Sequence, residues 1–286
     1  MAVYRRTYTS YTGALTPAWS RFLVLFRYSR RSLFRSKLQT ALFVLCFFFP
    51  LGCLLTIYLA HNLSFLERFS SNGLPFLQID NKFFFVFVTV QGTLAFVLTA
   101  FTGPGLISPD LANGALPLYF CRPFSRAEYV LGKTSVLAIL LSQITWMPGL
   151  ILFVVQASLA GPGWTSDHLW IAGSIVLSSM IWIVVLSLLA TALSAWVKWR
   201  IVAGALLLGV LFFGAGFGQA VNAVLRTQSG RFFDIGYLMG TVWSSLFRLD
   251  SERAMTSIEA WAALLIYCGI CLALLVRKVR AYEVVR

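Results

Sequence analysis

Six long apolar stretches constrain this sequence more than any other feature. Each is long enough to cross a hydrocarbon core of about 30 Å, which takes roughly 20 helical residues. Hydrophobic residues make up 59% of the 286 positions and charged residues 12%, too few polar groups for a water-soluble surface. The sequence therefore predicts an all-α polytopic membrane protein. The predicted transmembrane helices are Leu38 to Ala60, Phe83 to Ile107, Leu131 to Leu159, Leu169 to Ala195, Ile201 to Val221 and Ser257 to Val276.

The distribution of basic residues predicts how these helices are oriented. Of the 23 Lys and Arg residues, 17 fall in the N-terminal segment, the second loop, the fourth loop and the C-terminal tail. Basic residues accumulate on the cytoplasmic side of membrane proteins, so both termini and these two loops are expected there. The predicted regions are a cytoplasmic N-terminus (1–37), a six-span domain (38–276) and a cytoplasmic tail (277–286). Orientation and anionic lipid explain the excess positive charge, so no nucleic-acid partner is expected.

Two segments outside the spans carry a helical pattern. From Pro17 to Lys37, apolar and basic residues separate onto opposite arcs at 100° per residue, which predicts a helix lying in the membrane surface. A disordered basic leader is the alternative. The outer loop from Asn222 to Thr256 contains the apolar piece Phe232 to Leu249. A re-entrant or interfacial helical hairpin is expected here, because a seventh crossing would move the basic tail to the other side. In the segment from Pro17 to Lys37, the apolar arc contains Trp19, Phe22, Leu23, Phe26, Leu33 and Phe34, and the basic arc contains Arg21, Arg27, Arg31 and Arg35.

The loop from Ser108 to Lys133 carries the most specific motif. An acidic residue follows the second span, then come a Gly-x-Leu step, a Pro-x-Ser-Arg run, a second acidic residue and a closing Gly-Lys. This pattern resembles the signature of ABC-2 type permeases, with departures at Pro109 and Ala112, which that family usually fills with charged residues. The residues that carry the resemblance are Asp110, Gly114, Leu116, Pro123, Ser125, Arg126, Glu128, Gly132 and Lys133.

The resemblance implies a coupling role for this loop. In the family, it contacts the nucleotide-binding subunit and transmits its closure to the membrane helices. A plain connection between two spans is the alternative, although a few residues would suffice for that. Independently of the resemblance, Ser125 and Glu128 have the spacing of a capping box for a helix that begins at Arg126. The candidate coupling residues are Asp110, Gly114, Pro123, Ser125, Arg126, Glu128, Gly132 and Lys133.

The sequence offers no nucleotide site of its own. Gly132-Lys133-Thr134 resembles the end of a Walker A motif, but the glycine required five residues earlier is Ala127. ATP and Mg²⁺ are therefore expected on a separate ATPase chain, and no cofactor on this one.

The membrane helices hold neutral polar residues and glycines. No charged residue lies near the middle of a span, which argues against a proton-driven carrier. Five neutral side chains are candidates for a translocation path, although each is also explained by an interhelical hydrogen bond. They are Gln91, Thr99, Gln143, Gln219 and Asn222. Gly209, Gly214 and Gly218 allow close helix contact; the resemblance implies a dimer interface on this fifth span, and packing within one subunit is the alternative. Gly103-Pro104-Gly105 is a candidate hinge or a helix stop.

The resemblance implies a non-catalytic permease subunit of an ATP-driven exporter, and the uncharged span interiors favour a hydrophobic or amphipathic substrate. Its expected partners are cytoplasmic ABC ATPase subunits, a second copy of itself or a related permease, and the lipid bilayer. The expected location is the cytoplasmic (inner) membrane of a bacterium. One alternative is a membrane anchor for an ATPase that drives extracytoplasmic work. A membrane-embedded enzyme is a weaker alternative, because it would need His, Asp, Glu or Cys residues clustered at one membrane depth.

Overall fold

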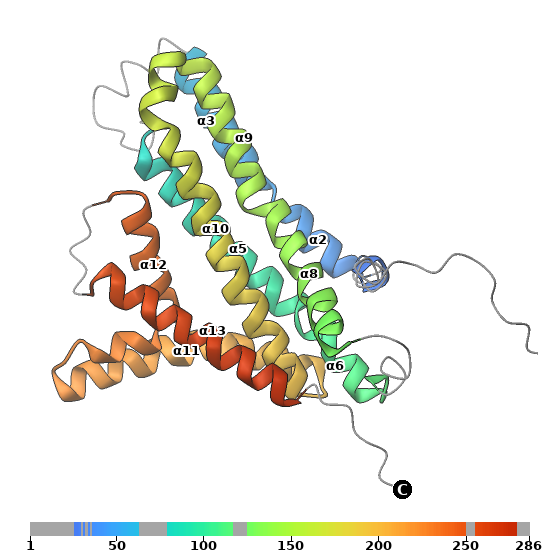
Figure 1. The fold of residues 1–286 in the computed structure, drawn as a ribbon. Coiled ribbons are helices and arrows are strands. Elements are labelled where there is room, and N and C mark those ends of the chain that lie inside the picture. The colour runs from blue at the N-terminus through green and yellow to red at the C-terminus, as the bar shows by residue number, and fades with distance from the viewer. Residues whose placement is uncertain are drawn as a thin grey trace, which may run out of the picture.

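The computed structural model describes residues 26–29, 31, 34, 36–62, 79–116, 125–249 and 255–278. Within these residues the chain is almost entirely helical and contains no strand (Figure 1). The helices are α2 (Lys37–Leu45), α3 (Phe48–Asn62), α5 (Asn81–Thr102), α6 (Pro104–Ala112), α8 (Arg126–Ile144), α9 (Trp146–Ala160), α10 (Pro162–Trp196), α11 (Arg200–Leu225), the 3₁₀ helix η3 (Ser229–Phe233), α12 (Ile235–Leu246) and α13 (Ser257–Lys278).

The described helices combine into six spans, as the sequence predicts. Three spans are single helices, α10, α11 and α13, and three are pairs in which α2 continues into α3, α5 into α6 and α8 into α9. In Figure 1, the starts of α2, α8 and α11 lie on the right with the ends of α6, α10 and α13, and the opposite ends lie on the left. This alternation is the one that the loop charges require, because the described basic residues Lys37, Lys133, Arg200 and Lys278 belong to helix ends on the same side of the bundle.

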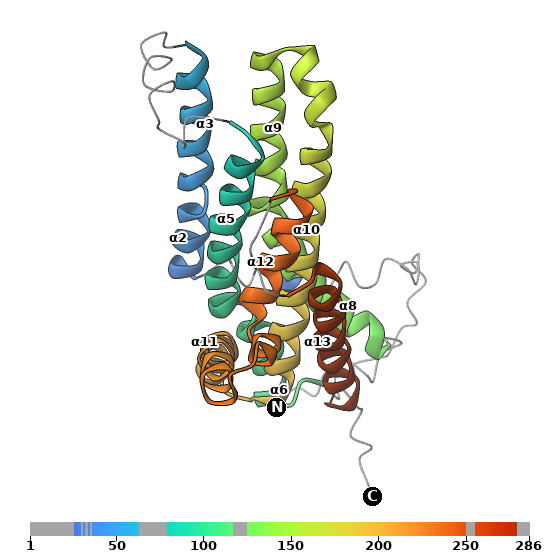
Figure 2. The same cartoon turned by 90° about the vertical axis from the view of Figure 1, so that its left-hand side faces the viewer.

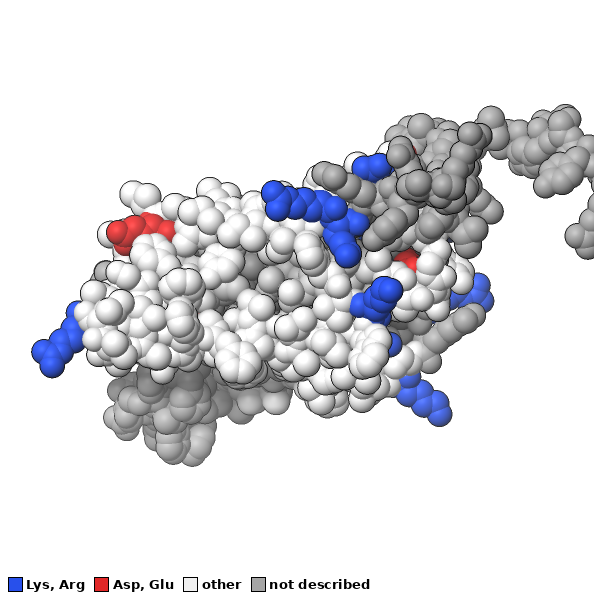
Figure 3. Space-filling model, turned by 90° about the horizontal axis from the view of Figure 1, so that it is seen from below, with Lys and Arg blue, Asp and Glu red and all other residues white. Residues whose placement is uncertain are grey.

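The charged side chains are also distributed unevenly between the two ends of the bundle. Figure 3 shows most of the visible Lys and Arg side chains toward the right-hand end of the molecule, where α6, α10 and α13 end, and a wide uncharged band on their left. Such a band is what a hydrocarbon core requires of the protein surface. Which end faces the cytoplasm stays a prediction from the loop charges.

Prolines explain why three of the spans are broken. Pro104 is the first residue of α6, and Pro50 and Pro148 lie in the first turns of α3 and α9. A proline has no backbone N–H and clashes with the preceding turn, so it is tolerated where a helix starts but interrupts one that should continue. Each of these spans thus consists of two helices, and the second helix of each pair has a proline in its first turn.

α10 is the central helix of the bundle. It is the most buried of the six spans and packs against α5, α6, α8, α9 and α13, whereas α11 is the most exposed. Figure 2 looks nearly along α11, and α3, α9 and α10 run across that direction. The fifth span therefore leans away from the bundle, with most of its surface uncovered by the described part of the chain.

The segment after α11 forms a helical hairpin instead of a seventh span. η3 lies on α11, and α12 then packs into the bundle with Leu238 and Val242 completely buried. The indole N–H of Trp243 donates to the carbonyl of Ser178 on α10 (3.2 Å), and the Asn81 amide donates to the carbonyl of Phe247 (2.9 Å). The structure therefore has short helices here, and α12 belongs to the core; a re-entrant or interfacial position of this segment stays a prediction.

The predicted surface helix lies mostly outside the described residues. Of the span from Pro17 to Lys37, residues 26–29 and 31 are helical, and Phe26 packs against the core.

Candidate coupling site

The two helices that flank the second loop are tied together by a buried charged group. α6 leads into this loop and α8 leads out of it. The Asp110 carboxylate on α6 forms an ion pair with the Lys133 ammonium on α8 (2.9 Å) and accepts a hydrogen bond from the Tyr129 hydroxyl (2.7 Å). We call Asp110, Tyr129 and Lys133 the loop joint.

The loop joint is shielded from water. The Lys133 side chain is 7% exposed, that of Asp110 17%, and Tyr129 is completely buried. Tyr129 and Lys133 lie one turn apart, so both reach Asp110 from the same face of α8. A buried ion pair with an added hydrogen bond holds one geometry strongly, because breaking it leaves an uncompensated charge. The ion pair and the hydrogen bond therefore hold α6 against α8.

The two ends of the loop are shaped by helix caps. α8 begins with the predicted capping box: the Ser125 hydroxyl accepts from the Glu128 N–H (3.2 Å), and the Glu128 carboxylate accepts from the Ser125 N–H (2.6 Å). α6 ends at Ala112, and Gly114 follows the C-cap residue Asn113 with a positive φ of 61°, which favours glycine. The Ala115 N–H bonds back to the carbonyl of Asp110 (2.8 Å), which completes a Schellman motif. Three of the predicted coupling residues, Ser125, Glu128 and Gly114, thus belong to helix caps.

The break between α5 and α6 leaves backbone groups that other helices satisfy. The Phe101 carbonyl, just before Pro104, accepts from the Arg200 guanidinium on α11 (3.0 Å) and from the Gln39 amide on α2 (3.4 Å). Spans one, two and five therefore meet at a single carbonyl. Gly103 also allows α5 to approach α10 closely, because a Cβ there would overlap Ala190.

A serine on α10 holds the first turn of α6. The Ser194 hydroxyl accepts from the N–H groups of Ile107 (3.2 Å) and Ser108 (2.9 Å) and donates to the Pro104 carbonyl (3.1 Å). Ser194 thus supplies hydrogen bonds to two N–H groups and one carbonyl near the start of α6 and ties this helix to α10. We call Phe101, Pro104 and their partners Gln39, Ser194 and Arg200 the hinge.

The remaining predicted coupling residues differ in exposure. Arg126 is exposed at the start of α8, Gly132 is buried within α8, and Pro123 lies outside the described residues. Sequence reasoning missed Tyr129, Ser194, Arg200 and Gln39. Tyr129 carried a signal, because it lies one turn before Lys133, whereas nothing in the sequence links Ser194 to α6, which lies 86 residues away.

The five polar residues suggested for a translocation path lie in three separate places. Gln91 and Thr99 are buried in the bundle, where the Gln91 amide donates to the Cys46 carbonyl (2.9 Å) and the Thr99 hydroxyl to Ala95 of its own helix (2.7 Å). Gln143 lines a groove between spans one and three. Gln219 is exposed near the end of α11, and Asn222 accepts from the Gly230 N–H (2.8 Å). A path through these residues stays a prediction.

Two of the three glycines on α11 contact the hairpin of the same chain. A Cβ at Gly214 or Gly218 would overlap the carbonyl of Phe233 or Gly230, so both glycines let η3 lie directly on α11. Gly209 instead lines an open groove with Phe213 and Tyr267. The dimer contact stays a prediction.

Clusters suited to a metal ion are not found in the described part of the chain, where no three His, Cys, Asp or Glu side chains come together.

Comparison with known proteins gives one family match. No curated protein matches the chain. The family model described as ABC-2 family transporter protein matches residues 30–283, which include all six spans, the loop joint and the hinge. The chain therefore belongs to the ABC-2 transporter family.

Proposed function

We propose that this chain is the non-catalytic permease subunit of an ATP-driven exporter and that separate cytoplasmic ATPase subunits bind its second loop. The observation that carries the proposal is the loop joint. Because Asp110 bonds to both Tyr129 and Lys133, a force on the loop acts on α6 and α8 together. A connection with no mechanical role would not need a buried ion pair, which costs desolvation energy to form.

The hinge gives that force a route into the membrane helices. Displacement of α6 acts on α10 through Ser194 and on α11 through the direct contacts between α6 and α11, while the Phe101 carbonyl ties α2 and α11 to α5 on the other side of the break. The break at Pro104 lets α6 change its angle to α5 without distorting either helix. Closure of the ATPases would thus rearrange spans one, two, four and five and open an outward path.

The rest of the proposal follows the chemistry of the chain. ATP and Mg²⁺ bind to the partner, because Ala127 interrupts the one Walker-like sequence. The cargo is hydrophobic or amphipathic, since the polar residues at membrane depth are uncharged. A second copy or a related permease covers the exposed apolar face of α11, beside a groove of about 570 Å³. The complex lies in a bacterial cytoplasmic membrane with both termini inside.

Affinity purification of the full chain in mild detergent tests the proposal. A Walker-motif ATPase should copurify in equal amount. The double variant Arg126→Glu/Glu128→Gln should reduce its yield about tenfold or more, because like charges across an interface cost several kcal/mol. Glutamine at position 128 still supports a capping box and an acid suits the first turn of a helix, so α8 should remain folded.

The matched control is Lys82→Glu, which reverses an exposed charge at the start of α5, at the other end of the bundle. This variant should retain the ATPase in full. Full retention by the double variant would contradict the proposed contact, and the absence of any ATPase from the wild-type preparation would contradict the proposed function.

A further inference from the structure

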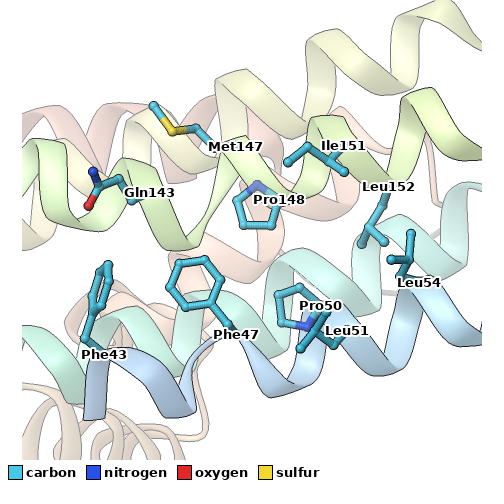
Figure 4. A pocket seen from close by; sticks show the side chains of 10 residues that line it. All are labelled: Phe43, Phe47, Pro50, Leu51, Leu54, Gln143, Met147, Pro148, Ile151 and Leu152. Carbon is cyan, nitrogen blue, oxygen red and sulfur yellow. The ribbon is translucent and has the colours of Figure 1, made fainter. Parts of the chain in front are cut away.

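A long apolar groove runs between the first and third spans (Figure 4). Its volume is about 580 Å³, and its walls come from α2 and α3 on one side and from α8 and α9 on the other. Pro50 and Leu152 are buried at its base, whereas Leu51 and Ile151 are 61% and 60% exposed. The groove is therefore open along one side, on the outer surface of the bundle.

The groove lies where both spans are broken. α2 gives way to α3 next to Phe47, and α8 gives way to α9 at Thr145. α3 packs along α9, and the helices continue from the breaks as α2 and α8. The groove follows the two spans past these breaks.

One end of the groove is polar and the other is not. Figure 4 shows Gln143 beside Phe43 at one end and Leu54 with Leu152 at the other. Gln143 is the one polar side chain in the lining, and its amide has no hydrogen bond to another described residue. Lys37 is exposed and begins the same span six residues before Phe43, about 9 Å away along the helix. The groove therefore has its one polar side chain at the end nearer to the Lys37 start of the span and a purely apolar end at Leu54.

This arrangement matches the order of groups in a membrane phospholipid. The lining from Phe43 to Leu54 extends about 16 Å along the span, enough for most of one acyl chain. In a bilayer, the surrounding tails are as apolar as the groove, so apolar contact alone gives no preference for a bound lipid. Any preference must come from the polar end, where an ammonium favours an anionic headgroup by about 1 kcal/mol.

We propose that this groove binds one acyl chain of an anionic glycerophospholipid. The tail lies along α3 and α9, an ester carbonyl accepts a hydrogen bond from the Gln143 amide, and the phosphate lies near Lys37. Binding of this lipid does not require transport or an ATPase, so the site is occupied in the isolated chain. This proposal and the proposed function can therefore be tested independently.

Photochemical labelling of the full chain tests the proposal. The chain is placed in phosphatidylcholine vesicles that contain a small fraction of phosphatidylglycerol with a diazirine at the end of one acyl chain. After irradiation, the labelled peptides are mapped by mass spectrometry. Label should concentrate on the α3 and α9 peptides around Leu54 and Leu152. Even labelling of these peptides and of the exposed apolar face of α11 would show annular lipid only and would overturn the proposal.

Filling the groove supplies a matched pair of variants. Ile151→Trp places a large side chain in the groove, whereas Val154→Trp changes a residue of the same helix that is 62% exposed and does not line it. Labelling of α3 should fall several-fold in the first variant and stay unchanged in the second. Equal labelling in both variants would overturn the proposal.

The headgroup is tested by charge removal. The phosphatidylglycerol probe should label the groove about five-fold more strongly than the same probe with a phosphatidylcholine headgroup, which corresponds to one favourable ammonium contact. Lys37→Gln should abolish this difference, and Lys82→Gln, at the other end of the bundle, should preserve it. A difference that survives Lys37→Gln would contradict the assignment of the phosphate to Lys37.

Discussion

Replacing Lys133 with methionine is expected to lower the stability of the purified chain by about 3 kcal/mol. The substitution keeps the apolar stem but removes the ammonium that lies 2.9 Å from Asp110. The carboxylate then remains largely buried with only the Tyr129 hydroxyl, and removing one partner of a buried ion pair costs about 3–5 kcal/mol. We expect the lower end of this range because Asp110 keeps 17% exposure. A fall in the midpoint of thermal unfolding in detergent measures the effect.

A double variant and a surface control make this test specific. Asp110→Asn/Lys133→Met removes both charges and should be more stable than Lys133→Met alone, because no unpaired charge remains. Lys198→Met removes an exposed lysine from the loop between α10 and α11 and should change stability by no more than about 0.5 kcal/mol. Equal effects of Lys133→Met and Lys198→Met would show that the loop joint does not hold α6 to α8.

Replacing Ser194 with alanine is expected to have the second large effect. The hydroxyl of Ser194 is the partner of the Ile107 and Ser108 N–H groups and of the Pro104 carbonyl. A buried polar group that loses its partner costs about 1–3 kcal/mol. Ser194→Ala should therefore lower the unfolding midpoint and loosen α6, which hydrogen exchange at Ile107 and Ser108 would report directly.

The same helix supplies the control for this serine. Ser187 is equally buried on α10, but its hydroxyl has no hydrogen-bond partner among the described residues. Ser187→Ala removes the same atom without leaving a group unpaired, so stability should be unchanged or slightly increased. Loss of stability of similar size in both variants would mean that packing of α10, and not the hinge, explains the effect.

The sequence predicted the features that depend on local chemistry. Hydropathy is sufficient to find the spans, because lipid demands about 20 apolar residues for each crossing. The capping box of Ser125 and Glu128 was equally accessible, since it depends on residues three positions apart. A short helix after the fifth span also followed, because a seventh crossing would have separated the basic tail from the other basic loops.

The features that sequence reasoning missed depend on which helix faces meet. In lipid there is little hydrophobic drive between helices, so an apolar pattern does not reveal which faces pair. The contact of Ser194 with α6 and that of Arg200 with Phe101 join residues 86 and 99 positions apart. Gly214 and Gly218 show the same difficulty: their spacing indicated close backbone contact but could not name η3 as the contacting element.

We propose that the energy source of this permease is a separate cytoplasmic chain that acts through the second loop. The most direct measurement is ATP hydrolysis by this chain after the copurifying ATPase has been removed, compared with hydrolysis by the intact complex at the same chain concentration. We predict hydrolysis by the complex and only background hydrolysis by the chain alone. Hydrolysis that remains with the isolated chain through gel filtration would contradict it.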